Sequence, residues 1–395
     1  MADPGLRGQI GGRRNLAATL LALLLALLLA ACAGGPRTAP TRAPAKAPPT
    51  TTAPVTQQGL PEDVDRHRVA LLVPITGPNA GVGQSIANAA VLALTDTKDR
   101  SLRVTTYDTG PGAAAAAAKA LAEGNALILG PLLGDDVRTV AGPAAARGVP
   151  VISFSNDTSV AADNVWLLGF QPAQSIERVV RYARSRGLTR FAGLVPQGAY
   201  GRTASNTLIR VAEAAGGSVV SMQSYDRSAG ITAAVTALAK QKFDAVLIAD
   251  SGRIAVVAVP LLRKQGATSA QVLGTELWNA EPGLASVAAM NGAWFASVDD
   301  RMFGQLQTRY RARYGKTPYR LASLGYDAVL LAVRIAREWK ANTPFPTDRL
   351  GDPGGFAGVD GAFRFGSNRI AERSLAVHQL GGGTRTIVSP PPTGF

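Results

Sequence analysis

The chain has 395 residues, a formal net charge of +14, one cysteine and two histidines. A single cysteine excludes an intrachain disulfide, and so few cysteines and histidines exclude a metal cluster built from these two residue types. We therefore expect no metal site. The basic charge is compatible with binding to an anionic lipid or an anionic cell-wall polymer. It is also compatible with an ordinary basic surface that has no specific partner. We expect no nucleic acid partner.

Residues 1–31 have the pattern of a secretory signal. Basic residues precede an apolar run of leucine and alanine, and small residues end it. The alternative is a transmembrane anchor. The run at 16–31 has only 16 residues, fewer than the roughly 20 that a helix needs to span a bilayer. The signal is therefore the preferred interpretation.

The four residues Leu29-Ala30-Ala31-Cys32 resemble the bacterial lipobox. That resemblance implies that Cys32 carries a lipid and becomes the first residue of the mature protein. It places the chain in the bacterial cell envelope, anchored to a membrane and facing the periplasm. Ala33 follows the cysteine, where retention in the inner membrane is associated with aspartate, and this favours the outer membrane.

Residues 32–60 comprise Cys32 and a linker rich in proline and threonine, with little to bury. The 28 residues after the cysteine would reach roughly 87 Å if extended at about 3.1 Å per residue. Two interpretations remain open: a tether that reaches a distant partner, or a spacer that clears the lipid headgroups.

In chain order, the remaining sequence alternates between short apolar runs and longer helical patterns. The runs are apolar on consecutive residues, as expected for parallel strands covered on both faces. The first block predicts strands at 69–73, 102–107, 126–129 and 151–152, and helices at 82–98, 111–124 and 135–147. The second block predicts strands at 191–195, 218–223, 245–249, 271–274 and 294–298, and helices at 173–186, 201–215, 230–240 and 253–265. Helices at 302–314 and 321–340 precede a tail with strands at 361–365 and 374–379.

This repetition predicts an α/β fold with two doubly wound lobes and a cleft between them. The part from residue 61 onward is also longer than one hydrophobic core comfortably supports. We expect lobe 1 to comprise 61–170 and to be completed by 300–348. We expect lobe 2 to comprise 171–299. Residues 349–395 are expected to form part of lobe 2 or the hinge, followed by the tail.

Ligands of open parallel sheets bind beyond the carboxyl ends of the strands. The residues that follow the predicted strands are rich in glycine, hydroxyl and amide groups. Each such loop, taken alone, reads as ordinary turn and N-cap residues. Their joint placement favours a small-molecule site, with these candidate ligand-binding residues: Thr76, Gly77, Ser155, Asn156, Thr158, Tyr200 and Glu276.

The sequence matches known motifs of enzyme active sites only poorly. Gly81-Val82-Gly83 opens a predicted helix after a strand, but Ile86 stands where a dinucleotide-binding motif has its third glycine. Ser85 lies in a near match to a nucleophile elbow, yet it falls inside the helical pattern rather than directly after a strand. His378 could act as the partner of Ser85 only if the carboxyl-terminal tail folded back toward it. We therefore expect no enzymatic activity and no cofactor.

Several of these segments resemble type I periplasmic binding proteins. The resemblance rests on residues 69–78 with Gly83, on Ile128-Leu129-Gly130-Pro131, on 148–153, and on Tyr200-Gly201. These motifs occur in the family's order and spacing, and the resemblance covers about residues 66–380. It implies two similar lobes around a ligand-binding cleft.

Within that family, one candidate is the branched-chain amino-acid receptor of transport systems. Ser155 and Thr158 match the family's hydroxyl loop, Tyr200 its aromatic residue, and Glu276 its ammonium-binding acid. Those receptors carry serines after the Gly-Pro of the third strand, where this chain has Leu132-Leu133. The difference argues against an amino acid as the ligand.

The other candidate is the penicillin-binding protein activator, a lipoprotein that the resemblance implies has the same fold. Gly130-Pro131-Leu132-Leu133 is similar to the activators' pattern, and the lipobox and long linker also fit. We therefore expect a non-enzymatic regulator of peptidoglycan synthesis whose partner is a peptidoglycan synthase. The alternative is a solute-binding receptor of an ABC transporter for branched-chain amino acids or related small molecules.

Overall fold

The computed structural model describes residues 66–228 and 230–392. The signal segment 1–31, Cys32 and the linker at 32–60 lie outside the described residues. Among the helices in the described part, none is both long and apolar enough to cross a lipid bilayer.

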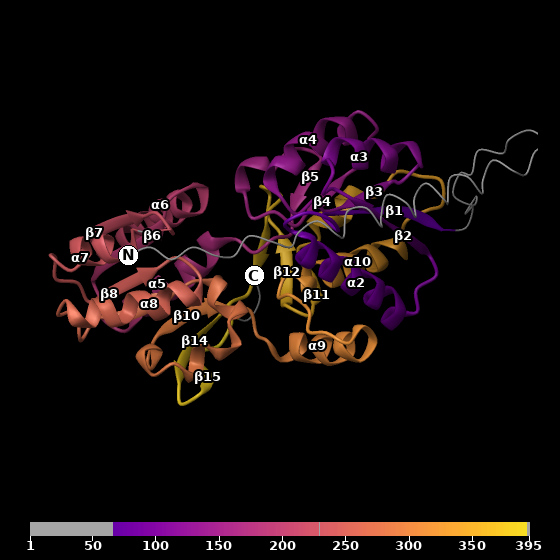
Figure 1. Ribbon diagram of the computed structural model, residues 1–395. Helices are drawn as coiled ribbons and strands as arrows, with labels where there is room; N and C mark the ends of the chain where they lie inside the picture. Colours follow the sequence, from indigo (N-terminus) through magenta and orange to yellow (C-terminus); the bar gives the residue numbers. More distant parts are fainter. Residues whose placement is uncertain (1–65, 229, 393–395) are drawn as a thin grey trace, which may run out of the picture. The chain divides into compact units, whose positions relative to one another are not determined.

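The first lobe is built on a five-stranded parallel sheet in the order β2-β1-β3-β4-β5 (Figure 1). Its strands are β1 (His67–Val73), β2 (Leu102–Asp108), β3 (Leu127–Leu129), β4 (Val151–Ser153) and β5 (Val165–Leu167). Four helices cover it: α2 (Ala80–Thr97), α3 (Ala113–Ala122), α4 (Gly134–Ala145) and α10 (Ala322–Ala336).

Both faces of this sheet are buried, which explains the continuous apolar run in β1. Leu71 packs in a core with residues of α2 and α10, whereas Leu72 packs in another core with residues of α3 and α4. Neither leucine side chain is exposed to solvent. Since successive side chains of a strand point to opposite faces, both sets must be apolar.

The second lobe is built on a seven-stranded sheet in the order β15-β14-β10-β9-β8-β6-β7. Its strands are β6 (Arg190–Pro196), β7 (Ser218–Tyr225), β8 (Ala245–Ile248), β9 (Gln271–Gly274), β10 (Trp294–Ser297), β14 (Ala376–Gly381) and β15 (Thr384–Ser389). The first five are parallel, and β14 runs antiparallel to β10 and to β15. One core contains residues of α5 (Pro172–Ser185) and α6 (Ala199–Ala214), and the other contains residues of α7 (Ile231–Leu238) and α8 (Gly252–Lys264).

A third, antiparallel sheet lies beside the first lobe. It consists of β11 (Phe356–Gly358), β12 (Gly361–Phe365) and β13 (Ala371–Arg373). Phe363 and Ala371 pack in the same core as α10. In the described part, the chain passes between the lobes after β5, after β10 into α9 (Arg301–Tyr314), and after β13.

The structure confirms the α/β class, the two doubly wound lobes and the predicted strands and helices of both blocks. Four strands were not predicted, namely β5, β11, β13 and β15, and the last helix ends at Ala336 rather than at residue 340. Short 3-10 helices also replace a plain loop between β9 and β10, at Glu276–Ala280, Pro282–Ser286 and Ala288–Met290. Several of these elements are only three residues long, too short for a periodic pattern to appear.

Candidate functional site

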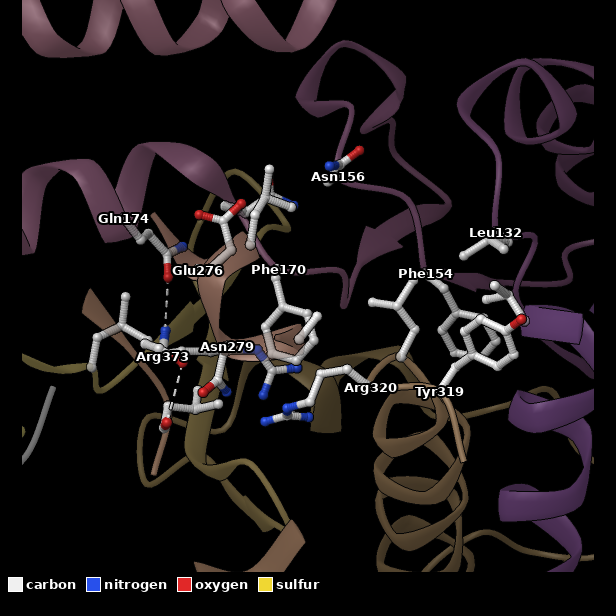
Figure 2. A pocket seen from close by; sticks show the side chains of 18 of the residues that line it. Leu132, Phe154, Asn156, Phe170, Gln174, Glu276, Asn279, Tyr319, Arg320 and Arg373 are labelled. Carbon is white, nitrogen blue, oxygen red and sulfur yellow. Dashed lines mark hydrogen bonds between the residues drawn. The ribbon is translucent and has the colours of Figure 1, made fainter. Parts of the chain in front are cut away.

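A cavity of about 460 Å³ lies between the two lobes (Figure 2). Residues directly after strands of both large sheets line it, as the rule for open parallel sheets predicts. The segments that connect the lobes complete it. The residues that line it include Val82, Leu132, Leu133, Phe154, Asn156, Phe170, Gln171, Glu276, Leu277, Tyr319, Arg320 and Arg373.

Two of the seven candidate residues, Asn156 and Glu276, line this cavity. Tyr200 lies one hydrogen bond away, because its hydroxyl donates to Glu276 Oε1 at 3.1 Å. The other four do not contribute to the lining: Thr76, Gly77, Ser155 and Thr158. As ligand contacts, all seven remain predictions.

Thr76 and its neighbours are held by a carboxylate from the adjacent strand. The Thr76 hydroxyl donates to Asp108 Oδ2 at 2.6 Å, and the Ile75 and Gly110 N–H groups donate to Asp108 Oδ1 at 2.9 and 2.8 Å. Burial by itself would raise the pKa of Asp108, but these hydrogen bonds hold it below its usual value. The Thr76 hydroxyl is therefore engaged in holding the loop after β1 against the end of β2.

In the loop after β4, the serine hydroxyl groups also form hydrogen bonds with the backbone of the same segment. The Ser155 hydroxyl accepts a hydrogen bond from the Asp157 N–H at 3.1 Å, and the Ser155 N–H donates to Ser153 Oγ at 3.0 Å. Thr158 begins a short 3-10 helix, for which Asp157 provides the N-terminal cap. Of this loop, only Asn156 reaches the cavity lining.

Glu276 lies at the cavity wall and receives two hydroxyl donors from the second lobe. Ser175 on α5 donates to Oε2, and Tyr200 on α6 donates to Oε1. Burial raises the pKa of Glu276, although these hydrogen bonds oppose the shift. Burial and then the nearby Glu276 carboxylate also raise the pKa of Tyr200. Both carboxylate oxygens are therefore already engaged.

Two arginines that the sequence did not single out also line the cavity. The Arg320 side chain is 9% exposed, and Arg373 is 8% exposed. Their guanidinium carbons lie 5.5 and 4.9 Å from the centre of the Phe170 ring. Both approach the same aromatic side chain, and Figure 2 shows them with Phe170. Isolated arginines in a loop and a short strand carry no sequence signal that marks them as cavity residues.

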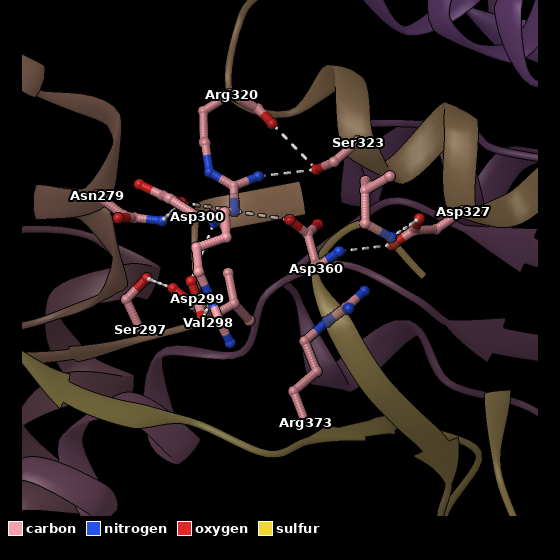
Figure 3. Close-up of polar contacts among 12 residues, drawn as sticks. Asn279, Ser297, Val298, Asp299, Asp300, Arg320, Ser323, Asp327, Asp360 and Arg373 are labelled. Atoms are coloured by element: carbon pink, nitrogen blue, oxygen red, sulfur yellow. Dashed lines mark hydrogen bonds and ion pairs between the residues drawn. The ribbon is translucent and has the colours of Figure 1, made fainter. Parts of the chain in front are cut away.

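Arg320 belongs to a network of ion pairs between the lobes (Figure 3). It lies 2.6 Å from Asp360 and 3.3 Å from Asp300. Asp300 also pairs with Arg385 of β15 at 2.9 Å and accepts a hydrogen bond from Asn279 at 2.8 Å. The network therefore joins the start of α10 to residues of the second lobe.

Across 66–228 and 230–392, no group of three or more His, Cys, Asp or Glu side chains is arranged to hold a metal ion. The sequence contains Gly315-Lys316-Thr317, but this triplet follows the carboxyl end of α9. A phosphate-binding loop instead connects a strand to the start of a helix.

Comparison with known proteins identifies relatives in sequence and in structure. The model of the family described as "Periplasmic binding protein" matches residues 67–384. An uncharacterized protein of Rickettsia prowazekii (strain Madrid E) is 30% identical over 142 residues, which cover 35% of this chain and 38% of that relative. The alignment thus spans well under half of the length of this curated relative.

Three solved structures illustrate the structural likeness. The leucine-binding protein LivK of Thermotoga maritima is 20% identical with a TM-score of 0.65, covering 82% of this chain and 98% of its own. LivJ of Streptococcus pneumoniae in complex with isoleucine is 18% identical with a TM-score of 0.63, covering 82% and 100%. A solute-binding protein of R. palustris in complex with 4-hydroxybenzoate is 15% identical with a TM-score of 0.67, covering 83% and 96%.

At these low identities, the solved structures establish the fold alone. They agree with the two-lobed α/β fold and its parallel sheets. The family model matches most of the chain. The protein therefore belongs to the periplasmic binding protein family and has the type I fold of the leucine-binding proteins.

Proposed function

We propose that this protein is a solute-binding receptor that captures a small molecule between its lobes and presents it to an ABC transporter. The observation that carries the proposal is the cavity of about 460 Å³ lined by residues of both lobes. Its volume falls within the range of roughly 300–1,000 Å³ that is usual for small-molecule sites. A ligand there would contact both lobes and so stabilise their association.

The comparisons favour the receptor over the regulator of peptidoglycan synthesis. The solved structures reported above include a transporter protein with isoleucine and an ABC-transporter solute-binding protein with 4-hydroxybenzoate. None of the findings supports a penicillin-binding protein activator or a synthase partner. We therefore adopt the receptor, which the sequence offered as the alternative.

The cavity also suits binding better than catalysis. Glu276 is the only carboxylate among its lining residues in the described part of the chain, and no histidine, cysteine or lysine lines it. General acid–base chemistry and nucleophilic catalysis usually need paired groups of these types. We propose that the protein acts without catalysis, anchored to the bacterial envelope by a lipid on Cys32.

The proposal can be tested with a cavity-filling substitution and a matched control. Val82 on α2 lines the cavity, whereas Val91 on the same helix is 43% exposed. We expect at least one small molecule in a panel of amino acids and organic acids to raise the unfolding temperature of the wild-type protein. A ligand at 100 times its Kd stabilises the folded state by about 2.7 kcal/mol.

The expected pattern is binding by the wild type and by Val91→Trp, with loss of binding in Val82→Trp. Isothermal titration calorimetry with the best compound would give the affinities. The proposal is wrong if no compound binds at millimolar concentration, or if Val82→Trp folds and binds as well as the wild type. Crosslinking that captures a peptidoglycan synthase and no permease would instead favour a regulator of peptidoglycan synthesis over a receptor.

A further inference from the structure

The first lobe contributes an apolar stretch to the cavity wall. Leu132 and Leu133 follow β3, Phe154 follows β4, and Tyr319 lies at the cavity beside α10. No hydroxyl or charged side chain comes from these positions except the Tyr319 phenol. A ligand with an apolar body would bury its surface here, which stabilises binding by about 25 cal/mol per Å².

The positive charge of the cavity comes from Arg320 and Arg373. The guanidinium group of Arg373 donates one hydrogen bond, from Nη2 to the Leu168 carbonyl at 2.9 Å. Its Nε and Nη1 atoms are buried without a hydrogen-bond partner among the described residues, and so is Nε of Arg320. Arginine has five N–H donors, and buried donors are almost always paired in folded proteins.

The aromatic rings around Arg373 compensate for this only in part. Its guanidinium lies 4.9 Å from the Phe170 ring centre and 5.1 Å from that of Phe363. Such cation–π contacts stabilise the charge but use none of its N–H donors. A carboxylate is the group that guanidinium donors match best, because two parallel hydrogen bonds can form.

The neighbouring carboxylates leave positive charge near the cavity. Asp360 pairs with Arg320, and Asp300 is shared between Arg320 and Arg385. Asp360 and Asp327 both act electrostatically on Arg373, but burial and the adjacent Asp360 raise the pKa of Asp327 to about 7. At neutral pH Asp327 is therefore ionised less completely than an ordinary aspartate. Asp327 therefore offsets the positive charge of Arg373 less than an ordinary aspartate would.

Glu276 does not supply an open site for an ammonium group. Its oxygens accept hydrogen bonds from Ser175 and Tyr200, and the Thr275 side chain and the Glu276 backbone N–H also hydrogen-bond to this carboxylate, so its roughly four acceptor positions are taken.

On the first-lobe wall, Leu132 and Leu133 provide no polar atom, and the side chains of Asn79 and Asn156 provide neutral amides only. Gln171 also lines the cavity, and its buried Oε1 has no hydrogen-bond partner among the described residues. The acceptor open to an amino group is therefore a neutral amide rather than a carboxylate, and it compensates less for the desolvation of an ammonium group.

We propose that the cavity selects small carboxylates with an apolar body, that Arg373 and Arg320 hold the carboxylate, and that no amino group is required. The inference rests on the receptor function proposed above and specifies its ligand class. Arg373 is the main anchor, because it has two unpartnered donors. Arg320 is largely committed to Asp360 and Asp300.

The test compares ligands that differ in one group. Calorimetry with 3-phenylpropanoate, its neutral amide and phenylalanine, and with 4-methylpentanoate and leucine, separates the carboxylate from the amino group. We expect one of the two simple acids to bind at least about tenfold more tightly than its neutral or amino-substituted analogue, since hydrogen bonds to charged groups are the stronger ones.

Substitutions of Arg373 identify the anchor. Arg373→Met should reduce affinity for the acid at least about tenfold, Arg373→Lys should restore part of it, and Arg202→Met, at an exposed position of α6, should change nothing. If Arg373→Met does not fold, the affinity of Arg373→Lys and the comparison of acids, amide and amino acids still test the inference. Equal binding of the amide, or unchanged affinity in a folded Arg373→Met, overturns the inference.

The outcomes separate this inference from the receptor function itself. Binding of amino acids alone, with no affinity for either simple acid, overturns the ligand class but leaves a receptor. Failure of every compound in the wider panel of amino acids and organic acids refutes the receptor function and the inference with it.

Discussion

A glycine in the first turn of α6 offers a sharp test of how the strand-end loops are built. A Cβ atom at Gly201 would lie 1.6 Å from the carbonyl oxygen of Pro196, at the end of β6. The first lobe has the same arrangement, with Gly83 of α2 at 2.0 Å from the Pro74 oxygen. Real Cβ contacts essentially never fall below 3.0 Å. In Gly201→Ala, the helix must therefore move away from the strand end by more than 1 Å.

We expect Gly201→Ala to destabilise the protein by about 3 kcal/mol, the upper end for overpacking, because the obstacle is backbone rather than a flexible side chain. At roughly 2–4 °C per kcal/mol, the unfolding temperature should fall by about 6–12 °C. The displacement should also disturb Tyr200, the preceding residue, and so weaken its hydrogen bond to Glu276.

Thermal unfolding followed by circular dichroism measures the effect, with Gly304→Ala as control. Gly304 lies within α9, and a Cβ there would meet nothing within 4 Å. Alanine at this position should stabilise the helix by up to about 1 kcal/mol. If Gly201→Ala unfolds at the wild-type temperature, the close approach of α6 to Pro196 is wrong.

Three further predictions concern the carboxyl groups and the anchor. Tyr200→Phe removes the donor to Glu276 and should cost about 1 kcal/mol of stability, measurable by chemical denaturation at pH 7; an unchanged midpoint would contradict it. Asp327 has a folded-state pKa of about 7 against 3.8 ordinarily, so folding favours its protonated form, and its contribution to stability is full below pH 4 and is lost as the pH rises to 7. Asp327→Asn should therefore gain stability relative to wild type between pH 4 and 8, and a constant difference across that range would refute the shift. Cys32→Ala should abolish labelling with radioactive palmitate and release the protein from membranes on fractionation, since stable anchoring needs lipid chains; unchanged labelling would sink the lipid anchor.

Much of this architecture was determined by the sequence itself, for a local reason. A strand covered on both faces must be apolar at every position, so Val69 to Val73 could be recognised as a buried parallel strand without its neighbours. The carboxyl ends of such strands then define where a ligand site forms. On that basis the sequence predicts Glu276 and Asn156 at the site, and both line the cavity. Leu132 and Leu133 line it too, although the sequence indicated only that they replace the serines of the amino-acid receptors.

Only the tertiary structure decided which polar groups face the cavity. The Thr76 hydroxyl follows a strand as expected, but Asp108 from the neighbouring strand engages it. Arg320 and Arg373 are far apart in the sequence and meet at Phe170 because the chain crosses between the lobes. Such pairings are set by long-range packing, and no periodic pattern or local propensity encodes them. The tail strand β14 joins the second sheet for the same reason, by pairing with the distant β10.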